Sequence, residues 1–295
     1  MTSEITSINE FASLVRDFIL TRTEKVISSY GCEINPESLV SGKMLRTLLA
    51  ARLAAYDTTF SNSETLVKAC AAVELVHTAS LLHDDVIDNG QIRRGVKTFW
   101  KATNPSQAIL TGDLLLCEAL DIIQKIKEGC YTALFVTKVR EVCQAEIEQE
   151  LILRRKELDE TTCMRLTRGK TGPFFAFVGL VCGGDNRSLS LALEEAGYLV
   201  GTAYQLADDF IDIVGDEKVC GKSLGSDLRR GKFTLPQSLG TPQKFYEKIS
   251  EVCISAIDCL DEWPQVQNGL KQFIKFDLQS TFDRTNSGIK VLCWV

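Results

Sequence analysis

Val73–Trp100 reads VELVHTASLLHDDVIDNGQIRRGVKTFW and predicts an apolar helix that ends in three aspartates. At about 3.6 residues per turn, Asp84 and Asp88 lie about 40° apart on one helical face, and His77 lies on that face about two turns earlier. Carboxylate oxygens at this spacing suit Mg²⁺ that is shared with a phosphate. A solvated acidic helix end is the alternative explanation of a single such motif.

The same pattern occurs a second time. His77–Asp88, HTASLLHDDVID, aligns with Gly201–Asp212, GTAYQLADDFID, and the two share Thr, Ala, Leu, Ile and three Asp at equivalent positions. Each copy is followed by Arg-Arg-Gly, at Arg93–Gly95 and Arg229–Gly231. The repetition indicates an internal repeat. It predicts two acidic, metal-binding helix ends that face each other across a cavity.

Bulk composition limits the class of protein. The chain has 295 residues, is 45% hydrophobic and 24% charged, and carries a net charge of −6, which favours a folded globular domain and argues against disorder. No basic stripe accompanies the acidic balance, so nucleic-acid binding is not expected. The 11 cysteines include no CxxC pair, and only 2 histidines occur, which argues against zinc. Many unpaired cysteines suit a reducing cytosol.

The ends and the linkers add little. The polar start of the chain lacks the pattern of a signal or transit peptide. The most apolar run, Phe174–Cys182, is far shorter than the roughly 20 residues of a membrane span. No low-complexity linker divides the chain. We therefore expect a single domain over residues 1–295, cytoplasmic and without a transmembrane segment.

Long intervals without proline indicate an all-α fold. Proline in a helix interior costs about 3 kcal/mol, so intervals that lack it permit long helices. Alternation typical of sheets is nearly absent. Periodicity predicts helices, with the prolines at helix joints, over 4–30, 41–56, 67–88, 104–120, 131–158, 162–180, 197–212 and 244–278. The glutamates of the 131–158 helix are expected to form a solvated face: Glu141, Glu146, Glu148 and Glu150.

Three cationic stretches are candidate phosphate sites. Lys43 and Arg46 share a helical face just after Gly42, at a predicted helix start that would favour an anion, although a solvated pair is the alternative. Gly169–Thr171 reads GKT but lacks the glycine spacing of a phosphate loop. The glycine-rich segment 215–236 carries several cations and would close over a charged ligand, unless it is an ordinary surface loop.

Taken together, these residues resemble the trans-isoprenyl diphosphate synthases, the polyprenyl synthetase family, over roughly residues 41–236. SGKMLR resembles the family's GGKxxR, and DDVID and DDFID match its two aspartate-rich motifs. The first is followed by RRG and the second by GK…GxDLxxGKxTLP. The resemblance implies an all-α, single-domain helical bundle of the isoprenoid-synthase type around a deep central cavity, usually assembled as a homodimer.

The resemblance also implies a reaction: isopentenyl diphosphate is condensed head-to-tail onto an allylic diphosphate, with about three Mg²⁺ in the site. The implied metal ligands are Asp84, Asp88, Asp208 and Asp212. The implied allylic diphosphate site is Arg93, Lys170, Thr171, Gln205, Lys222 and Lys232, of which Lys170, Thr171 and Gln205 also border the developing cation. The implied isopentenyl diphosphate site is Gly42, Lys43, Arg46, His77 and Arg94.

Two residues depart from the family pattern. Ser41 replaces the usual first glycine, and Thr47 stands where proline is usual. Neither change removes a cation, so we expect an altered fit and retained binding.

Product length follows from the residues before the first aspartate. In the family, aromatic side chains four and five residues before it block the cavity, and here those positions hold Ser80 and Ala79. Small side chains leave room, so the resemblance implies products beyond twenty carbons, of the hexaprenyl to octaprenyl kind. A short-chain farnesyl or geranylgeranyl product is the alternative if residues such as Phe135 close the cavity.

Other functions fit less well. A class I terpene cyclase shares one aspartate motif, but it has no need of the Lys43 and Arg46 site or of a complete second motif. A non-catalytic subunit of a heteromeric synthase commonly lacks aspartates, and none is missing here. An obligate heteromer remains an alternative to the homodimer, and product release at a membrane surface would need only peripheral contact.

Overall fold

Helices form most of the regular structure of the protein in the computed structural model, which describes residues 8–29, 42–55, 63–93, 95–126, 131–214, 231, 233–235 and 241–283. In chain order the elements are α1 (Ile8–Ser29), α3 (Leu45–Ala54), α4 (Ser63–Ile87), β1 (Ile92–Arg93), β2 (Val96–Lys97), α5 (Phe99–Ala102), α6 (Pro105–Gln124), α7 (Tyr131–Ile147), the π-helix η1 (Glu148–Ile152), α8 (Glu160–Cys182), α9 (Arg187–Val214), α13 (Pro242–Asp258), α14 (Pro264–Gln272), the π-helix η2 (Phe273–Leu278) and α15 (Gln279–Asp283).

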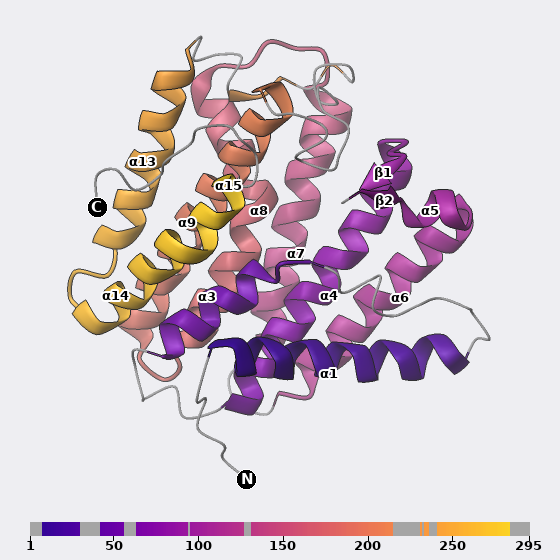
Figure 1. The fold of residues 1–295 in the computed structure, drawn as a ribbon, viewed down its shortest axis with the longest axis horizontal. Helices are drawn as coiled ribbons and strands as arrows, with labels where there is room; N and C mark the ends of the chain where they lie inside the picture. The colour runs from indigo at the N-terminus through magenta and orange to yellow at the C-terminus, as the bar shows by residue number, and fades with distance from the viewer. Residues whose placement is uncertain are drawn as a thin grey trace.

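The predicted all-α class is confirmed, with one small exception that the sequence patterns did not indicate. β1 and β2 form an antiparallel hairpin that projects beyond the end of α4, with Arg93 opposite Val96 (Figure 1). Its turn needs a left-handed backbone, and Gly95 has a φ of 78° there. The strands are two residues long, too short for a period-two pattern to be visible.

Prolines and short polar side chains begin several helices. Pro105, Pro242 and Pro264 are first residues of α6, α13 and α14, as expected for prolines at helix joints. Asn104 caps α6 by accepting a hydrogen bond of 2.9 Å from the N–H of Gln107. Pro173 is the exception: α8 continues through it, so the predicted joint at this proline is wrong.

Three predicted boundaries also change. The predicted helix over 131–158 ends earlier, because α7 gives way to a π-helix after Ile147. α9 begins at Arg187, well before the predicted 197, since apolar residues recur at helical spacing from there. α3 begins at Leu45, after Met44 in a left-handed conformation with φ 52°, so Gly42 lies before the helix and not at its start.

Glycines allow α8 and α9 to pack closely. A Cβ added at Gly201 would lie 2.6 Å from the Cα of Gly172, and one added at Gly197 would lie 2.5 Å from the carbonyl oxygen of Phe175. Neither distance is possible for a real side chain, so these glycines set the separation of the two helices. The second aspartate motif on α9 is thereby held against the segment of α8 that contains Lys170 and Thr171.

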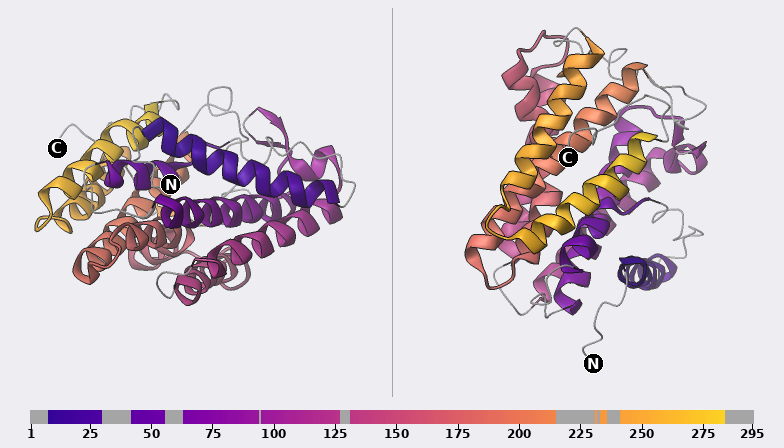
Figure 2. Two further views of the ribbon diagram at one scale, coloured as in Figure 1. Left: turned by 90° about the horizontal axis from the view of Figure 1, so that it is seen from below. Right: turned by 60° about the vertical axis from the view of Figure 1, so that its left-hand side comes forward.

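The buried apolar side chains of the described helices form one continuous cluster, with contributions from α1 through η2. α1 packs against α4 and crosses it obliquely (Figure 1 and Figure 2), and its Arg22 pairs with Glu118 and Asp121 of α6. A single domain over residues 1–295 stays a prediction.

One helix of the described part, Glu64–Ile87 within α4, has the length and composition of a membrane span. In its most apolar 18-residue stretch, 61% is buried inside the protein. The core helix of a water-soluble protein passes the same test, so this is a weak indication of a span. The expected absence of a transmembrane segment stays a prediction.

Candidate active site

The first aspartate motif lies where α4 ends. Asp84 is half-buried, whereas Asp88 is exposed and lies one residue beyond the helix, with its N–H donating to the carbonyl oxygen of Asp84 at 2.7 Å. Asp85, between them, is only 6% exposed. The chain then reverses through Asn89, which has a φ of 52°, and Gly90, whose N–H donates to the carbonyl oxygen of Asp85 at 2.9 Å.

The reversal brings Arg93 of the hairpin back onto Asp85. The guanidinium Nε donates to both carboxylate oxygens at 3.0 Å, and a terminal nitrogen donates to Oδ1 at 2.8 Å. This two-pronged geometry fixes the plane of the guanidinium as well as its position. The middle aspartate therefore orients an arginine, a role that the spacing of the motif did not predict.

The same guanidinium lies near the second motif. Burial lowers the pKa of Arg93, but the hydrogen bond and charge of Asp85, together with the charges of Asp84 and Asp208, outweigh burial and raise it. The charges of Asp84 and Asp208, one from each repeat, therefore both act on one guanidinium. The fold thus brings together three residues that the sequence analysis assigned to one site.

On α9 the middle aspartate again holds a neighbour. Asp209 is 7% exposed and accepts a hydrogen bond of 2.8 Å from the amide nitrogen of Gln205. The amide oxygen of Gln205 accepts one of 2.5 Å from the hydroxyl of Thr171 on α8. The chain Thr171–Gln205–Asp209 therefore fixes both ends of the Gln205 amide. Asp208, like Asp84, is half-buried.

The third aspartates of the two motifs differ. Asp88 is exposed because α4 ends at Ile87, whereas Asp212 is 5% exposed because α9 continues to Val214 and keeps that residue inside the bundle. The repeat is therefore symmetric at its first two aspartates and asymmetric at the third.

Lys170 is held by two residues of the glutamate-rich segment. Its ammonium group donates to the amide oxygen of Gln149 at 2.7 Å and lies 3.2 Å from the carboxylate of Glu146. Glu146 was predicted to be solvated and Gln149 was given no role, although their i, i+3 spacing places them on one face. Gln149 lies in η1, and π-helical turns are frequent at functional sites.

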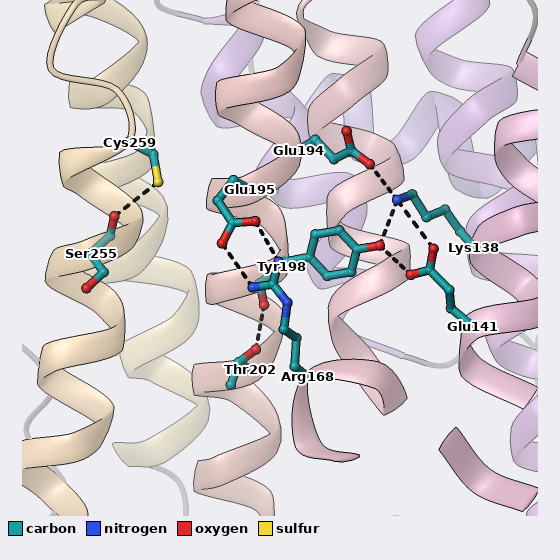
Figure 3. Close-up of polar contacts among 9 residues, drawn as sticks. All are labelled: Lys138, Glu141, Arg168, Glu194, Glu195, Tyr198, Thr202, Ser255 and Cys259. Atoms are coloured by element: carbon teal, nitrogen blue, oxygen red, sulfur yellow. Dashed lines mark hydrogen bonds and ion pairs between the residues drawn. The ribbon is translucent and has the colours of Figure 1, made fainter. Parts of the chain in front are cut away.

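The prediction of a solvated glutamate face is wrong for Glu150, whose side chain is only 15% exposed, and the other three glutamates contact side chains of neighbouring helices. Besides Glu146, Glu148 pairs with Arg165 of α8 at 2.6 Å, and Glu141 accepts a hydrogen bond from the hydroxyl of Tyr198 (Figure 3). These contacts cross between helices, and helical periodicity carries no information about such partners.

Two other cations of the predicted site are Lys43, just before α3, and Arg46, in the first turn of α3. Lys43 is half-buried, and the carbonyl oxygen of Gly42 accepts a hydrogen bond of 3.4 Å from Arg16. Arg46 is 6% exposed, with its guanidinium carbon 5.7 and 5.2 Å from the ring centres of Phe174 and Phe175. Burial lowers its pKa, against the charge of Glu74. A solvated surface pair, the alternative explanation of these cations, is therefore wrong for Arg46.

Of the other predicted site residues, some lie within the described part of the chain and some lie outside it. His77 is half-buried on α4, and its carbonyl oxygen accepts a hydrogen bond of 2.8 Å from the hydroxyl of Ser80. Ala79 is buried at 3% exposure. Arg94, Lys222 and Lys232 lie outside the described residues.

The chemistry of the aspartates suits magnesium. Asp84, Asp88 and Asp208 offer hard oxygen donors, and the first and last lie near one guanidinium. Within the described ranges, no three carboxylate, histidine or cysteine side chains are close enough to hold an ion by themselves. Mg²⁺ usually takes one or two carboxylates and completes its shell with phosphate and water, so the donors fit an ion bound together with a phosphate.

The fold is that of the isoprenoid synthases: a polyprenyl synthase from Caulobacter crescentus, solved with calcium and isoprenyl diphosphate, aligns over 90% of this chain and 94% of its own at a TM-score of 0.77 and 24% identity. A heptaprenyl diphosphate synthase from Staphylococcus aureus aligns over 98% and 100% at 0.75 and 22%. The polyprenyl synthetase family model matches residues 33–256, and the chain belongs to that family.

Relatives in the family differ in product. The chain is 34% identical over 66% of its length to a geranylgeranyl diphosphate synthase from Methanosarcina mazei and 33% identical over 66% to an octaprenyl diphosphate synthase from Haemophilus influenzae. These matches span only 62% and 60% of those relatives. A short chain isoprenyl diphosphate synthase from Methanothermobacter thermautotrophicus is 30% identical over 86% of this chain and 82% of its own.

Proposed function

We propose that this protein is a Mg²⁺-dependent prenyltransferase that condenses isopentenyl diphosphate head-to-tail onto an allylic diphosphate to give a trans-polyprenyl diphosphate. One observation carries the proposal: Asp85 fixes the guanidinium of Arg93 through hydrogen bonds, and the charges of Asp84 and Asp208, one from each repeat, act on that same guanidinium. An oxygen-rich metal site next to a fixed guanidinium suits a diphosphate better than any neutral ligand.

The chemistry requires charge separation. The bond between the allylic carbon and the diphosphate oxygen breaks, the double bond of isopentenyl diphosphate attacks that carbon, and a proton leaves to the departing diphosphate. Bound Mg²⁺ would neutralise charge on the leaving group. Arg93 and Lys170 add fixed positive charge there, and the hydroxyl of Thr171 and the amide of Gln205 border the cation. Lys222 and Lys232 complete this half of the proposed site.

The second substrate would bind without metal. Its diphosphate would be held by Lys43, Arg46, His77 and Arg94, with Gly42 at the backbone turn. Arg46 supports this assignment, because it is a buried cation beside α4, α8 and α9, three helices that carry other residues of the proposed site. Phosphate groups are the usual partners of such arginines.

We propose a product longer than twenty carbons. Ala79 and Ser80 are small, and Val73 and Val76 deeper on α4 are of modest size and buried. Phe135, the candidate floor, is fully buried and packs against Phe177 at a ring separation of 5.1 Å. Relatives of the family make both short and long products, so length rests on the residues of this chain.

A homodimer is the proposed assembly. Large apolar side chains remain exposed on α6, α7 and η1: Ile109, Leu110, Leu134, Val136, Ile147, Leu151 and Ile152. Exposed apolar surface of this kind is typical of protein interfaces. Light scattering on the purified chain would give twice the monomer mass. Cytoplasmic location, with peripheral membrane contact at product release, completes the proposal.

The product assay tests the function. The purified chain is incubated with Mg²⁺, farnesyl diphosphate and labelled isopentenyl diphosphate, and the dephosphorylated products are sized. A ladder that ends above twenty carbons is expected. A product of fifteen or twenty carbons would keep the reaction and overturn the length assignment. No condensation by the folded chain would overturn the function and favour a cyclase or a partner-dependent subunit.

A further inference from the structure

Arg46 is an incompletely satisfied buried cation. Its side chain is 7% exposed, and the nearest carboxylate oxygen, Oε2 of Glu74, lies 3.7 Å from a terminal nitrogen, which is within ion-pair range and too long for a hydrogen bond. The Nε is buried and has no hydrogen-bond partner among the described residues. Since a guanidinium has five N–H donors, this one retains donors for a ligand.

The other oxygen of the same carboxylate is held by Thr47. Oε1 of Glu74 accepts hydrogen bonds from the backbone N–H of Thr47 at 3.4 Å and from its hydroxyl at 3.3 Å. Thr47 is the third residue of α3, so its N–H belongs to the first helical turn and has no acceptor within the helix. Glu74 of α4 therefore caps α3 from a different helix.

Threonine at position 47 supplies both of these donors, its backbone N–H and its hydroxyl. Proline has no N–H and no hydroxyl, so it supplies neither donor to Glu74. In this chain the two donors hold one oxygen of the carboxylate and leave the other directed at Arg46. The pair Glu74 and Thr47 thus controls how close the carboxylate comes to the guanidinium.

We propose that Glu74 and Thr47 are positioning residues for isopentenyl diphosphate: Thr47 holds the carboxylate of Glu74, and Glu74 orients the guanidinium of Arg46 toward the diphosphate. This inference rests on the proposed function, which assigns Arg46 to that substrate. Orientation by a carboxylate that stays outside hydrogen-bond range leaves the guanidinium donors available, whereas a closed salt bridge would occupy them.

Steady-state kinetics of four variants test the inference. Glu74→Gln removes the charge and is expected to raise KM for isopentenyl diphosphate about tenfold, with kcat and KM for farnesyl diphosphate within about twofold of wild type. Thr47→Val removes one donor and is expected to raise the same KM about threefold, whereas Thr47→Ser keeps both donors and should match wild type. Asp277→Asn is the matched control. It removes a carboxylate that lies 2.7 Å from the Nε of Arg52, an arginine on the same helix, α3, as Arg46.

Each other outcome has a defined meaning. An unchanged KM for isopentenyl diphosphate in folded Glu74→Gln, an equal rise for both substrates, or the same rise in Asp277→Asn would overturn the inference. If Glu74→Gln does not fold, KM for isopentenyl diphosphate in the two Thr47 variants tests the inference. A higher KM in Thr47→Val than in Thr47→Ser would support it, and equal values would overturn it. If the wild-type chain performs no condensation, the proposed function fails separately. In that case, calorimetric binding of inorganic pyrophosphate tests whether Glu74 and Thr47 position Arg46. Equal affinity of wild type and Thr47→Val for pyrophosphate would overturn the inference.

Discussion

At the level of single residues, the aspartates of each motif divide into two roles. Asp85 and Asp209 are buried and accept hydrogen bonds from Arg93 and Gln205. Their oxygens are therefore committed to positioning neighbours. Asp84 and Asp208 are half-buried beside the guanidinium of Arg93, and they are the carboxylates we expect to bind metal.

Replacing either first aspartate should stop the reaction. Asp84→Ala or Asp208→Ala removes a metal ligand, so kcat should fall by at least about 10²-fold while helicity by circular dichroism stays unchanged. Asp113→Ala on α6 is a suitable control, because that carboxylate is 58% exposed and lies 3.5 Å from His83, outside the proposed site. Full activity in Asp84→Ala or Asp208→Ala would refute the metal assignment.

Replacing the middle aspartate should act through Arg93. Asp85→Asn keeps one acceptor oxygen but loses the charge and the two-pronged contact, so we expect kcat to fall about tenfold or more. Arg93→Lys should lose a similar amount, because lysine cannot reproduce the fork. Glu118→Gln serves as the control, since Glu118 also pairs with an arginine, Arg22 of α1. Wild-type kinetics in Asp85→Asn would show that Arg93 needs no orientation.

At the level of helices, the separation of α8 and α9 depends on glycine. Gly201→Ala would place a methyl group 2.6 Å from the Cα of Gly172, so the helices must move apart. The expected loss of unfolding free energy is about 1–3 kcal/mol, measured by chemical denaturation. Activity should fall as well, because Thr171 and Gln205 are bonded across this pair. Ser188→Ala, at an exposed position on α9, should change neither the stability nor the activity. A Gly201→Ala variant as stable as wild type would contradict the close approach of the two helices.

The contact between α7, α8 and α9 predicts a stability change in alkali. Lys138 donates to Glu194 and Tyr198, and Arg168 lies 4.2 Å from the ring centre of Tyr198 (Figure 3). Burial, aided by the hydrogen bond to Glu141, raises the pKa of Tyr198 to about 12. Burial alone lowers the pKa of Lys138, but its hydrogen bonds to Glu194 and Tyr198 outweigh burial and raise it.

The raised pKa values of Tyr198 and Lys138 both make the folded protein less stable as pH rises. Between the ordinary tyrosine pKa of about 10 and the folded value, the folded protein binds more protons than the unfolded chain, so stability falls as pH rises. The melting temperature of wild type should therefore drop more steeply above pH of about 10 than that of Tyr198→Phe, which cannot ionise there. Parallel curves for the two proteins would contradict the coupling.

At the level of the whole molecule, product length depends on the space beside α4. Filling that space with Ala79→Tyr and Ser80→Phe should shorten the product to about twenty carbons or fewer, because large rings replace a methyl and a hydroxymethyl group. Product sizing with farnesyl diphosphate and labelled isopentenyl diphosphate measures this. Cys117→Ala, at an exposed cysteine of α6, is the control. An unchanged ladder would place the end of the cavity on another helix.

Local patterns were sufficient for most helices and for the motifs. Periodicity and proline spacing predict most helices, since a helix face is set by residues three and four apart. The repeat predicts two aspartate motifs, and the resemblance assigns their partners. The same local reasoning misplaces boundaries such as the end of α7, because a π-helix depends on contacts outside the segment.

Partners distant in the chain became apparent only in the folded molecule. The pairing of Asp85 with Arg93 depends on a chain reversal, that of Lys170 with Gln149 on packing of η1 against α8, and that of Arg46 with Glu74 on burial between helices. Composition and spacing predict which types of residue bind a diphosphate. Which carboxylate binds metal and which orients a cation follows from burial and long-range contact, and neither is a property of local sequence.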